Sequence, residues 1–171
     1  MSETAAAEGF WRFSLTVYAR PGVAEALIGL QDRHGHNVNL MLFGLWLGVC
    51  EGRRIDAAAL GRARTAMARI DSKVVAPLRR LRRQLKGDPD PDIQTLRRRV
   101  LALELAAERR VQARLVSSVG RPRRASPGGR TAIAEVNLRL ILGPDFDLPE
   151  AAVVRAALAK SRFVIPAKAG T

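Results

Sequence analysis

The sequence has little cysteine and no sign of a secretory leader. Cys50 is the single cysteine among 171 residues, so no disulfide can form within the chain, which fits a reducing compartment. The first ten residues contain two acids and no base, and they lack the positive start and the apolar run of a secretory signal. We therefore expect a cytoplasmic protein.

Long apolar runs are lacking as well. The most apolar run, Val38 to Cys50, has 13 residues, whereas a membrane-spanning helix needs about 20. A helix of this composition is apolar on all sides, which is typical of the buried centre of a globular domain. Gly44 and Gly48 would let another helix approach it closely. The sequence predicts no membrane span and a central apolar helix over 38–50.

Aromatic residues and acids are also scarce. Aromatic residues make up 5% of the chain, and none lies between residues 51 and 145, so that region offers no side chains on which nucleic-acid bases could stack. The chain has 29 Lys and Arg against 16 Asp and Glu, which gives a net charge of +13. Residues 51–118 hold 17 basic and 8 acidic side chains, so most of the excess lies in the middle of the chain.

The sequence motifs of several common enzyme sites are missing. There is no phosphate-binding Gly-rich loop, no Gly-x-Ser-x-Gly elbow and no Cys-x-x-Cys pair. We therefore predict no set of catalytic residues, no metal site and no cofactor.

Helical periodicity runs along most of the chain, and no segment has the pattern of a strand. We expect an all-α protein with about six to seven helices around the central helix. Two long segments, 57–86 and 91–118, are predicted to pair as an antiparallel helical hairpin. Pro77 should kink or break the first of them near Val75, because proline disrupts the interior of a helix.

The helices are predicted to form one domain over residues 8–160. Residues 120–130 are rich in Gly, Pro and Arg, which predicts a flexible linker within that domain. Residues 161–171 lack helical periodicity and offer little apolar area, so a disordered tail is predicted there.

Residues suited to helix ends mark several boundaries. We expect the first helix to begin at Glu8. Gly35 is placed to end the second helix in the left-handed conformation. Asn37, Asp56 and Asp90 are each placed to accept hydrogen bonds at the start of a helix.

A dense group of polar residues, 31–39, lies between two apolar helices, and we call it the polar corner. Asp32, His34 and His36 could bind a metal ion or take part in acid–base chemistry. Alternatively, these residues and Asn37 could satisfy the free backbone groups of the two helix ends. We favour the structural interpretation, because a metal site with such short spacing needs further ligands.

Asn39 lies inside the apolar helix, where a buried amide must find hydrogen-bond partners. Trp11, Tyr18 or Asp32 could supply them. We expect Asn39 to fix how three helices meet, and a ligand contact is the alternative.

Basic residues gather at one end of the predicted hairpin, just before and just after its turn. Such a patch could neutralise several phosphates of a polyanion, whereas many charged helix faces are only solvated. The residues of this predicted polyanion patch are Arg79, Arg80, Arg82, Arg83, Lys86, Arg97, Arg98 and Arg99.

Two parts of the chain carry a resemblance to a known family. The matching residues are Phe10-Trp11, Phe13-Ser14, Tyr18-Ala19-Arg20-Pro21-Gly22-Val23, Leu30-Gln31-Asp32, His34-Gly35, Val38-Asn39 and the run from Pro77 to Arg83. With these residues, the segment from about 10 to 115 resembles an uncharacterised proteobacterial family known only as a domain of unknown function. The resemblance implies no activity.

The sequence thus favours a binding or adaptor module that acts on an unidentified protein partner. The second hypothesis is binding of nucleic acid or another polyanion through the Arg-rich hairpin. An enzyme that uses the polar corner is the third.

Overall fold

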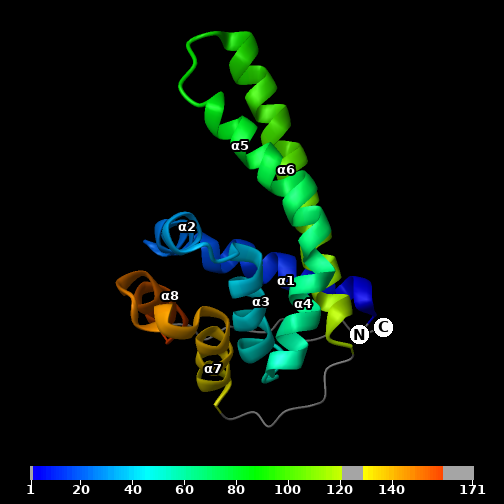
Figure 1. Cartoon of the computed structure of the whole chain (residues 1–171), viewed down its shortest axis with the longest axis vertical. Coiled ribbons are helices and arrows are strands. Elements are labelled where there is room, and N and C mark those ends of the chain that lie inside the picture. The colour runs from blue at the N-terminus through cyan, green and yellow to red at the C-terminus, as the bar shows by residue number, and fades with distance from the viewer. Residues whose placement is uncertain (1, 121–128, 160–171) are drawn as a thin grey trace.

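The computed structural model describes residues 2–120 and 129–159, and these residues fold into helices joined by short turns (Figure 1). The helices are α1 (Glu3–Tyr18), α2 (Val23–His34), α3 (Val38–Val49), α4 (Ala57–Ile70), α5 (Ala76–Gln84), α6 (Pro91–Ser118), α7 (Arg130–Leu142) and α8 (Pro149–Ala159). A π-helical turn (Asp71–Val75) joins α4 to α5, and a 3-10 turn (Gly143–Asp147) follows α7. With α4 and α5 counted as one rod, the described ranges contain seven rods and no strand, which confirms the predicted all-α fold.

The predicted central helix is α3. Every residue from Asn39 to Val49 is buried, and Trp46 is only 4% exposed. Helices α1, α2, α6 and α7 all pack against α3. The ring centroid of Phe10 lies 5.4 Å from that of Phe43 and 5.3 Å from that of Trp46. Because each fully buried large apolar side chain contributes about 1.5–3 kcal/mol, α3 and its neighbours supply much of the stability of the fold.

The close approach of α7 to α3 depends on two glycines. A Cβ atom at Gly48 would overlap the backbone of Ala134, and one at Gly44 would overlap the side chain of Ile141. Ala134 cannot move easily, because its backbone belongs to the interior of α7. The pair of glycines noted in the sequence therefore marks the contact with α7.

We expect Gly48→Ala to lower the free energy of unfolding by about 1–3 kcal/mol or more, because the added methyl group must push α7 away. Gly61→Ala is the matched control. Gly61 lies within α4 with open space around it, so its replacement should raise the free energy of unfolding by about 0.5–1 kcal/mol. Urea denaturation of both variants tests this contrast, and stabilisation by both would contradict the close packing of α3 and α7.

The predicted helix boundaries are confirmed at four positions. Gly35 ends α2 with a φ of 73°, in the left-handed region that glycine adopts without strain. Asn37, Asp56 and Asp90 precede α3, α4 and α6, and each side chain accepts a hydrogen bond from a backbone N–H of the first turn.

The start of α1 differs from the prediction. The helix begins at Glu3 and not at Glu8, because the Ser2 side chain accepts a hydrogen bond from the backbone N–H of Ala5. The extra turn places Ala6 in the apolar core. A serine cap followed by three alanines was the signal in the sequence for this earlier start.

Pro77 disturbs the hairpin where the sequence predicts, but it does not break the helix. The chain passes from α4 to α5 through the π-helical turn, in which the N–H of Ala76 donates to the carbonyl of Asp71 five residues earlier. In an α-helix the proline ring would collide with the carbonyl four residues before it. The wider turn accommodates the ring while the rod continues.

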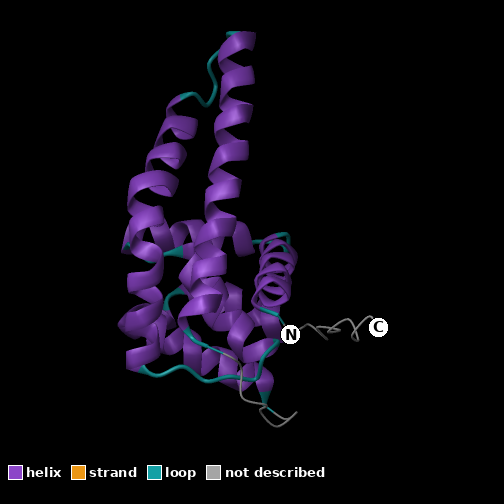
Figure 2. Ribbon diagram, turned by 90° about the vertical axis from the view of Figure 1, so that its right-hand side faces the viewer, coloured by secondary structure: helices purple, strands orange, loops and turns teal. Residues whose placement is uncertain are grey.

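The predicted antiparallel hairpin is confirmed. The rod of α4 and α5 runs beside α6, and the end of the hairpin that holds α5 extends beyond the body of the molecule (Figures 1 and 2). Among the described helices, none is long and apolar enough to cross a membrane. Most of the predicted 120–130 linker and the whole 161–171 tail lie outside the described residues, so these two predictions stay predictions.

Candidate binding cleft

A cleft of about 530 Å³ lies where the hairpin meets α1, α2 and α3. Its volume falls within the range of about 300–1,000 Å³ that is typical of small-ligand sites. The apolar lining consists of Trp11, Leu15, Ala19, Ile28, Val38, Leu42, Leu101 and Leu105. The polar lining consists of Ser14, Tyr18, Gln31, Asn39, Arg79, Arg82, Arg83, Glu104, Glu108 and Gln112.

Two arginines of α5 and two glutamates of α6 form an ion-pair network on one wall of the cleft. Glu104 is buried, and its carboxylate accepts hydrogen bonds from Arg79 Nε at 3.1 Å and from Arg82 Nε at 2.5 Å. Arg79 also donates to Glu108 at 2.6 Å and to Gln31 of α2 at 2.7 Å. Because charge-assisted hydrogen bonds of this kind are strong and directional, the network holds α5, α6 and α2 in a fixed arrangement.

The base of the cleft contains a buried amide with an unused acceptor. Gln112 Nε2 donates to Ser14 Oγ at 3.1 Å and to Asn39 Oδ1 at 2.9 Å. Gln112 is only 2% exposed, and its Oε1 has no hydrogen-bond partner among the residues that the structure describes. Asn39 therefore joins α1, α3 and α6 as predicted, but through Gln112 and not through Trp11, Tyr18 or Asp32.

The mouth of the cleft exposes apolar side chains. Leu15, Ile28, Leu101 and Leu105 all line the cleft and are between 37% and 52% exposed. Exposed apolar groups that gather beside polar ones are typical of binding surfaces. The cleft thus combines an apolar mouth with a charged wall and a polar base.

Two acidic groups of the cleft have shifted pKa values. Burial raises the pKa of Glu108, and the neighbouring Arg79 only partly offsets this effect. Burial also raises the pKa of Tyr18, and the negative charge of Glu108 adds to the rise. The Tyr18 hydroxyl therefore remains a hydrogen-bond donor at neutral pH.

The raised pKa of Glu108 predicts a pH dependence of stability. Between the ordinary Glu pKa of about 4.3 and the higher folded-state pKa, the folded protein binds more protons at Glu108 than the unfolded chain does. The stabilisation is therefore complete below the ordinary value and is lost as the pH rises through the folded-state pKa. We expect the free energy of unfolding of the wild type, measured relative to Glu108→Gln, to fall from pH ~4 to pH ~8. A difference that does not change with pH would contradict the burial of this carboxylate.

The polar corner does not converge on one point. Asp32 turns towards the hairpin and pairs with Arg83, the two side chains lying 3.0 Å apart. His36 Nε2 and His34 Nδ1 lie 2.8 and 3.9 Å from the carboxylate of Asp145, which follows α7. Acid–base residues that are adjacent in the sequence are therefore divided between two separate surfaces.

The two asparagines of the polar corner also separate. Asn37 caps α3 and donates to Asp71 at 3.0 Å, which is the helix-end role predicted for it. Of Asp32, His34, Asn37 and Asn39, Asn39 alone lines the cleft, together with Gln31 and Val38 of the same corner. Among the described residues, no group of three His, Cys, Asp or Glu side chains could hold a metal ion.

The residues of the predicted polyanion patch differ in whether an ion pair neutralises their charge. Arg79 and Arg82 are neutralised by Glu104 and Glu108, and Arg83 pairs with Asp32. The other five form no ion pair with any residue that the structure describes, and these are Arg80, Lys86, Arg97, Arg98 and Arg99.

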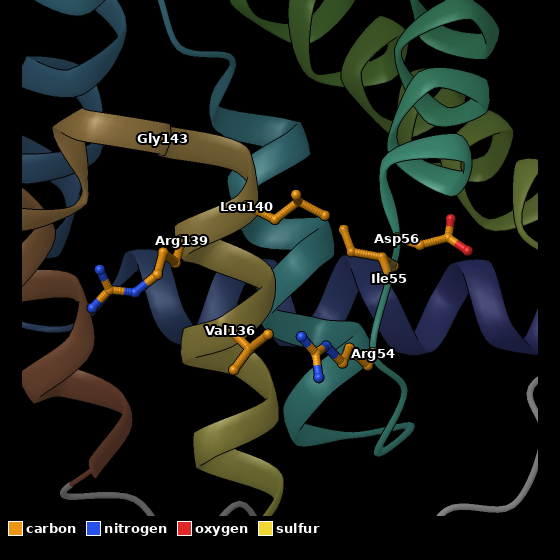
Figure 3. Close-up of a pocket in the computed structure, with 7 residues that line it drawn as sticks. All are labelled: Arg54, Ile55, Asp56, Val136, Arg139, Leu140 and Gly143. Carbon is orange, nitrogen blue, oxygen red and sulfur yellow. The ribbon is translucent and has the colours of Figure 1, made fainter.

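A second hollow, of about 710 Å³, lies between α7 and the segment that leads into α4 (Figure 3). Ile55 and Leu140 point towards each other across it, whereas Arg139 points away, with its guanidinium 3.9 Å from the ring centroid of Phe146. None of the buried polar atoms that lack a partner in the described structure belongs to its lining. The hollow therefore offers a ligand less to recognise than the cleft does.

Residues 9–115, well over half of the chain, match the family described as "Protein of unknown function (DUF2390)". The chain belongs to the DUF2390 family. This confirms the resemblance to a family of unknown function. No curated protein matches the chain, and no solved structure does. Every residue that lines the cleft lies within the segment matched to DUF2390, whereas α7, which forms one side of the second hollow, lies outside it. The cleft is thus a feature of the DUF2390 segment.

Several residues that carry the resemblance to the family line the cleft, namely Trp11, Ser14, Tyr18, Ala19, Gln31, Val38, Asn39, Arg79, Arg82 and Arg83. The sequence analysis missed the partners of these residues on α6. Glu104 was the available signal, because it occupies an apolar position in the helical register of Ala107 and Val111. Glu108 and Gln112 follow it at intervals of four residues and so face the same side.

Proposed function

We propose that this member of the DUF2390 family is a binding module whose cleft takes a small amphipathic ligand. The apolar body of the ligand packs against the leucines and Ile28 at the mouth. A hydrogen-bond donor of the ligand reaches Gln112 Oε1 at the base. The unpartnered acceptor at the base of a cleft with an exposed apolar mouth is the observation that carries this proposal.

The cost of an unpaired buried acceptor supports the proposal. A buried polar group without a partner costs about 1–3 kcal/mol, and buried polar groups in proteins are nearly always paired. The Nε2 atom of the Gln112 amide is already committed to Ser14 and Asn39, so Oε1 is held in a fixed position. A donor that enters the cleft removes the cost of the unpaired oxygen, and that gain favours binding.

The cleft supports binding over catalysis. Its one aliphatic hydroxyl, Ser14, donates to the carbonyl of Phe10 at 2.9 Å and not to a base. The two histidines of the chain lie at the polar corner and face Asp145, away from this hydroxyl. A nucleophile needs a base within hydrogen-bond reach, and this arrangement does not provide one.

The experiment uses anilinonaphthalene sulfonate, a fluorescent probe with an aromatic body, an N–H donor and a sulfonate that suits an arginine. We expect saturable binding of one probe per chain. The double change Leu101→Gln and Leu105→Gln should weaken binding at least about tenfold, which corresponds to about 1.4 kcal/mol. Leu103→Gln is the control, because Leu103 is 60% exposed on the same helix but does not line the cleft.

Two results would overturn the proposal. One is equal binding by the wild type and the Leu101/Leu105 variant. The other is a loss of binding on changing Val136 and Leu140 to Gln, because this would place the site in the second hollow.

A further inference from the structure

The side of the hairpin that faces away from the cleft carries a second exposed apolar surface. It consists of Leu81 on α5 and of Leu96 and Leu103 on α6, and we call it the back face. These side chains are 42%, 50% and 60% exposed. Such large exposed fractions on three apolar side chains within two paired helices are typical of an interaction surface.

Helical spacing shows that the three residues lie opposite the cleft. Leu96 and Leu103 are seven residues apart and so share one side of α6. Leu101 and Leu105 line the cleft, and the 100° step per residue places them roughly opposite Leu103. On α5 the same step separates Leu81 from the cleft residue Arg79 by about 200°.

The back face lies among cations whose charges are not neutralised. On α6, Arg99 and Arg110 continue the same three- and four-residue spacing as Leu96 and Leu103, and both are exposed. Neither arginine forms an ion pair with a described residue. Asp92 adjoins the stripe at the tip of the hairpin, so the positive charge is concentrated in the stretch from Leu96 to Arg110.

This combination of groups discriminates between possible occupants. A second copy would bring the same arginines together, and each chain has a net charge of +13, so like-charge repulsion opposes self-association. A nucleic acid would pair with the arginines but would leave the leucines in water, and the hairpin has no aromatic side chain for base stacking. An acidic partner that also carries apolar residues satisfies both kinds of group.

We propose that the back face docks an acidic amphipathic helix of a protein partner. The partner's apolar stripe covers Leu96 and Leu103, and its flanking carboxylates pair with Arg99 and Arg110. The stretch from Leu96 to Arg110 is about 21 Å long at 1.5 Å per residue, which matches a partner helix of about four turns. Recognition of this kind is common for amphipathic helices that bind to an apolar surface.

Because the back face and the cleft lie on opposite sides of the hairpin, this inference stands independently of the proposed ligand. Leu101 and Leu103 distinguish the two sites, since they are exposed leucines of the same helix on opposite sides. If Leu103→Gln left peptide binding unchanged while the fluorescent probe still bound in the cleft, only the docking surface would be rejected.

The experiment measures fluorescence anisotropy of a labelled four-turn helical peptide, with leucines along one side and glutamates along its flanks, as the full chain is added. We expect binding that weakens with salt between ~50 and ~300 mM, because the exposed charge pairs are screened. Leu103→Gln should weaken binding at least about tenfold, and so should Arg99→Glu combined with Arg110→Glu. Leu101→Gln should leave the affinity unchanged.

Three outcomes would overturn the proposal. The first is no peptide binding, or an equal loss of peptide affinity in the Leu101→Gln and Leu103→Gln variants. The second is tighter binding of single-stranded DNA or polyphosphate that Leu103→Gln does not affect, because the surface would then be a polyanion site. The third is a dimer in sedimentation velocity that Leu103→Gln dissociates, because a second copy would then be the occupant.

Discussion

Replacing Glu104 by alanine is expected to lower the free energy of unfolding by about 3–5 kcal/mol. The side chain of Glu104 is 4% exposed and accepts hydrogen bonds from both Arg79 and Arg82. Its removal leaves two partly buried guanidinium groups short of their main counterion, and breaking one side of a buried ion pair is strongly destabilising. Urea denaturation of the full chain measures the change.

The matched control is the exposed ion pair that Arg83 of the hairpin forms with Asp32 of α2. Asp32→Asn removes the negative charge opposite Arg83, but both side chains of that pair are more than a third exposed. Exposed ion pairs contribute about 0–1 kcal/mol, so this variant should unfold almost as the wild type does. If Glu104→Ala were no more destabilising than Asp32→Asn, the network would not hold the hairpin against α2.

Replacing Asn137 by alanine is expected to lower the free energy of unfolding by about 3 kcal/mol or more. Asn137 is completely buried, its Oδ1 accepts from the N–H of Ile55 at 2.9 Å, and its Nδ2 donates to the carbonyls of Gly44 and Arg53 at 3.0 and 2.9 Å. The alanine variant leaves the N–H of Ile55 and the carbonyl of Arg53 without this partner, and each such buried group costs about 1–3 kcal/mol. This one side chain therefore ties α7 to α3 and to the loop before α4.

Asn37→Ala provides the comparison for Asn137. Both changes remove an asparagine side chain, but Asn37 is partly exposed and caps α3 with one hydrogen bond to the N–H of Leu40. Loss of a helix cap costs about 1 kcal/mol. Equal losses for the two variants would contradict the role of Asn137 in joining α7 to α3.

The fold could largely be predicted because it follows from local patterns. The apolar run of α3 is too short for a membrane and too apolar for a surface, which leaves the centre of the body. The helix caps act within one turn of the chain, so Asn37 and Asp56 could be identified directly. The hairpin follows from two long periodic segments joined by a short turn.

The cleft could not be predicted in the same way, because its contacts join distant parts of the chain. Ser14 and Gln112 are 98 residues apart in the sequence, and no local pattern pairs them. The polar corner shows the opposite case, since Asp32 and His36 are neighbours in sequence but face different elements. Helix packing decides both outcomes, and periodicity alone does not specify which helices meet.

The π-helical turn before α5 also constrains how many residues can join α4 to α5. The turn holds about one residue more than an α-helical turn, which rotates α5 by about 100° relative to an uninterrupted helix. Arg79 and Arg82 meet Glu104 in this rotated position. A relative that lacks one residue between Asp71 and Val75 would carry the same arginines on the wrong side of the rod. In an alignment of the family, a gap at this place would therefore mark a different cleft, even where every arginine and glutamate is retained.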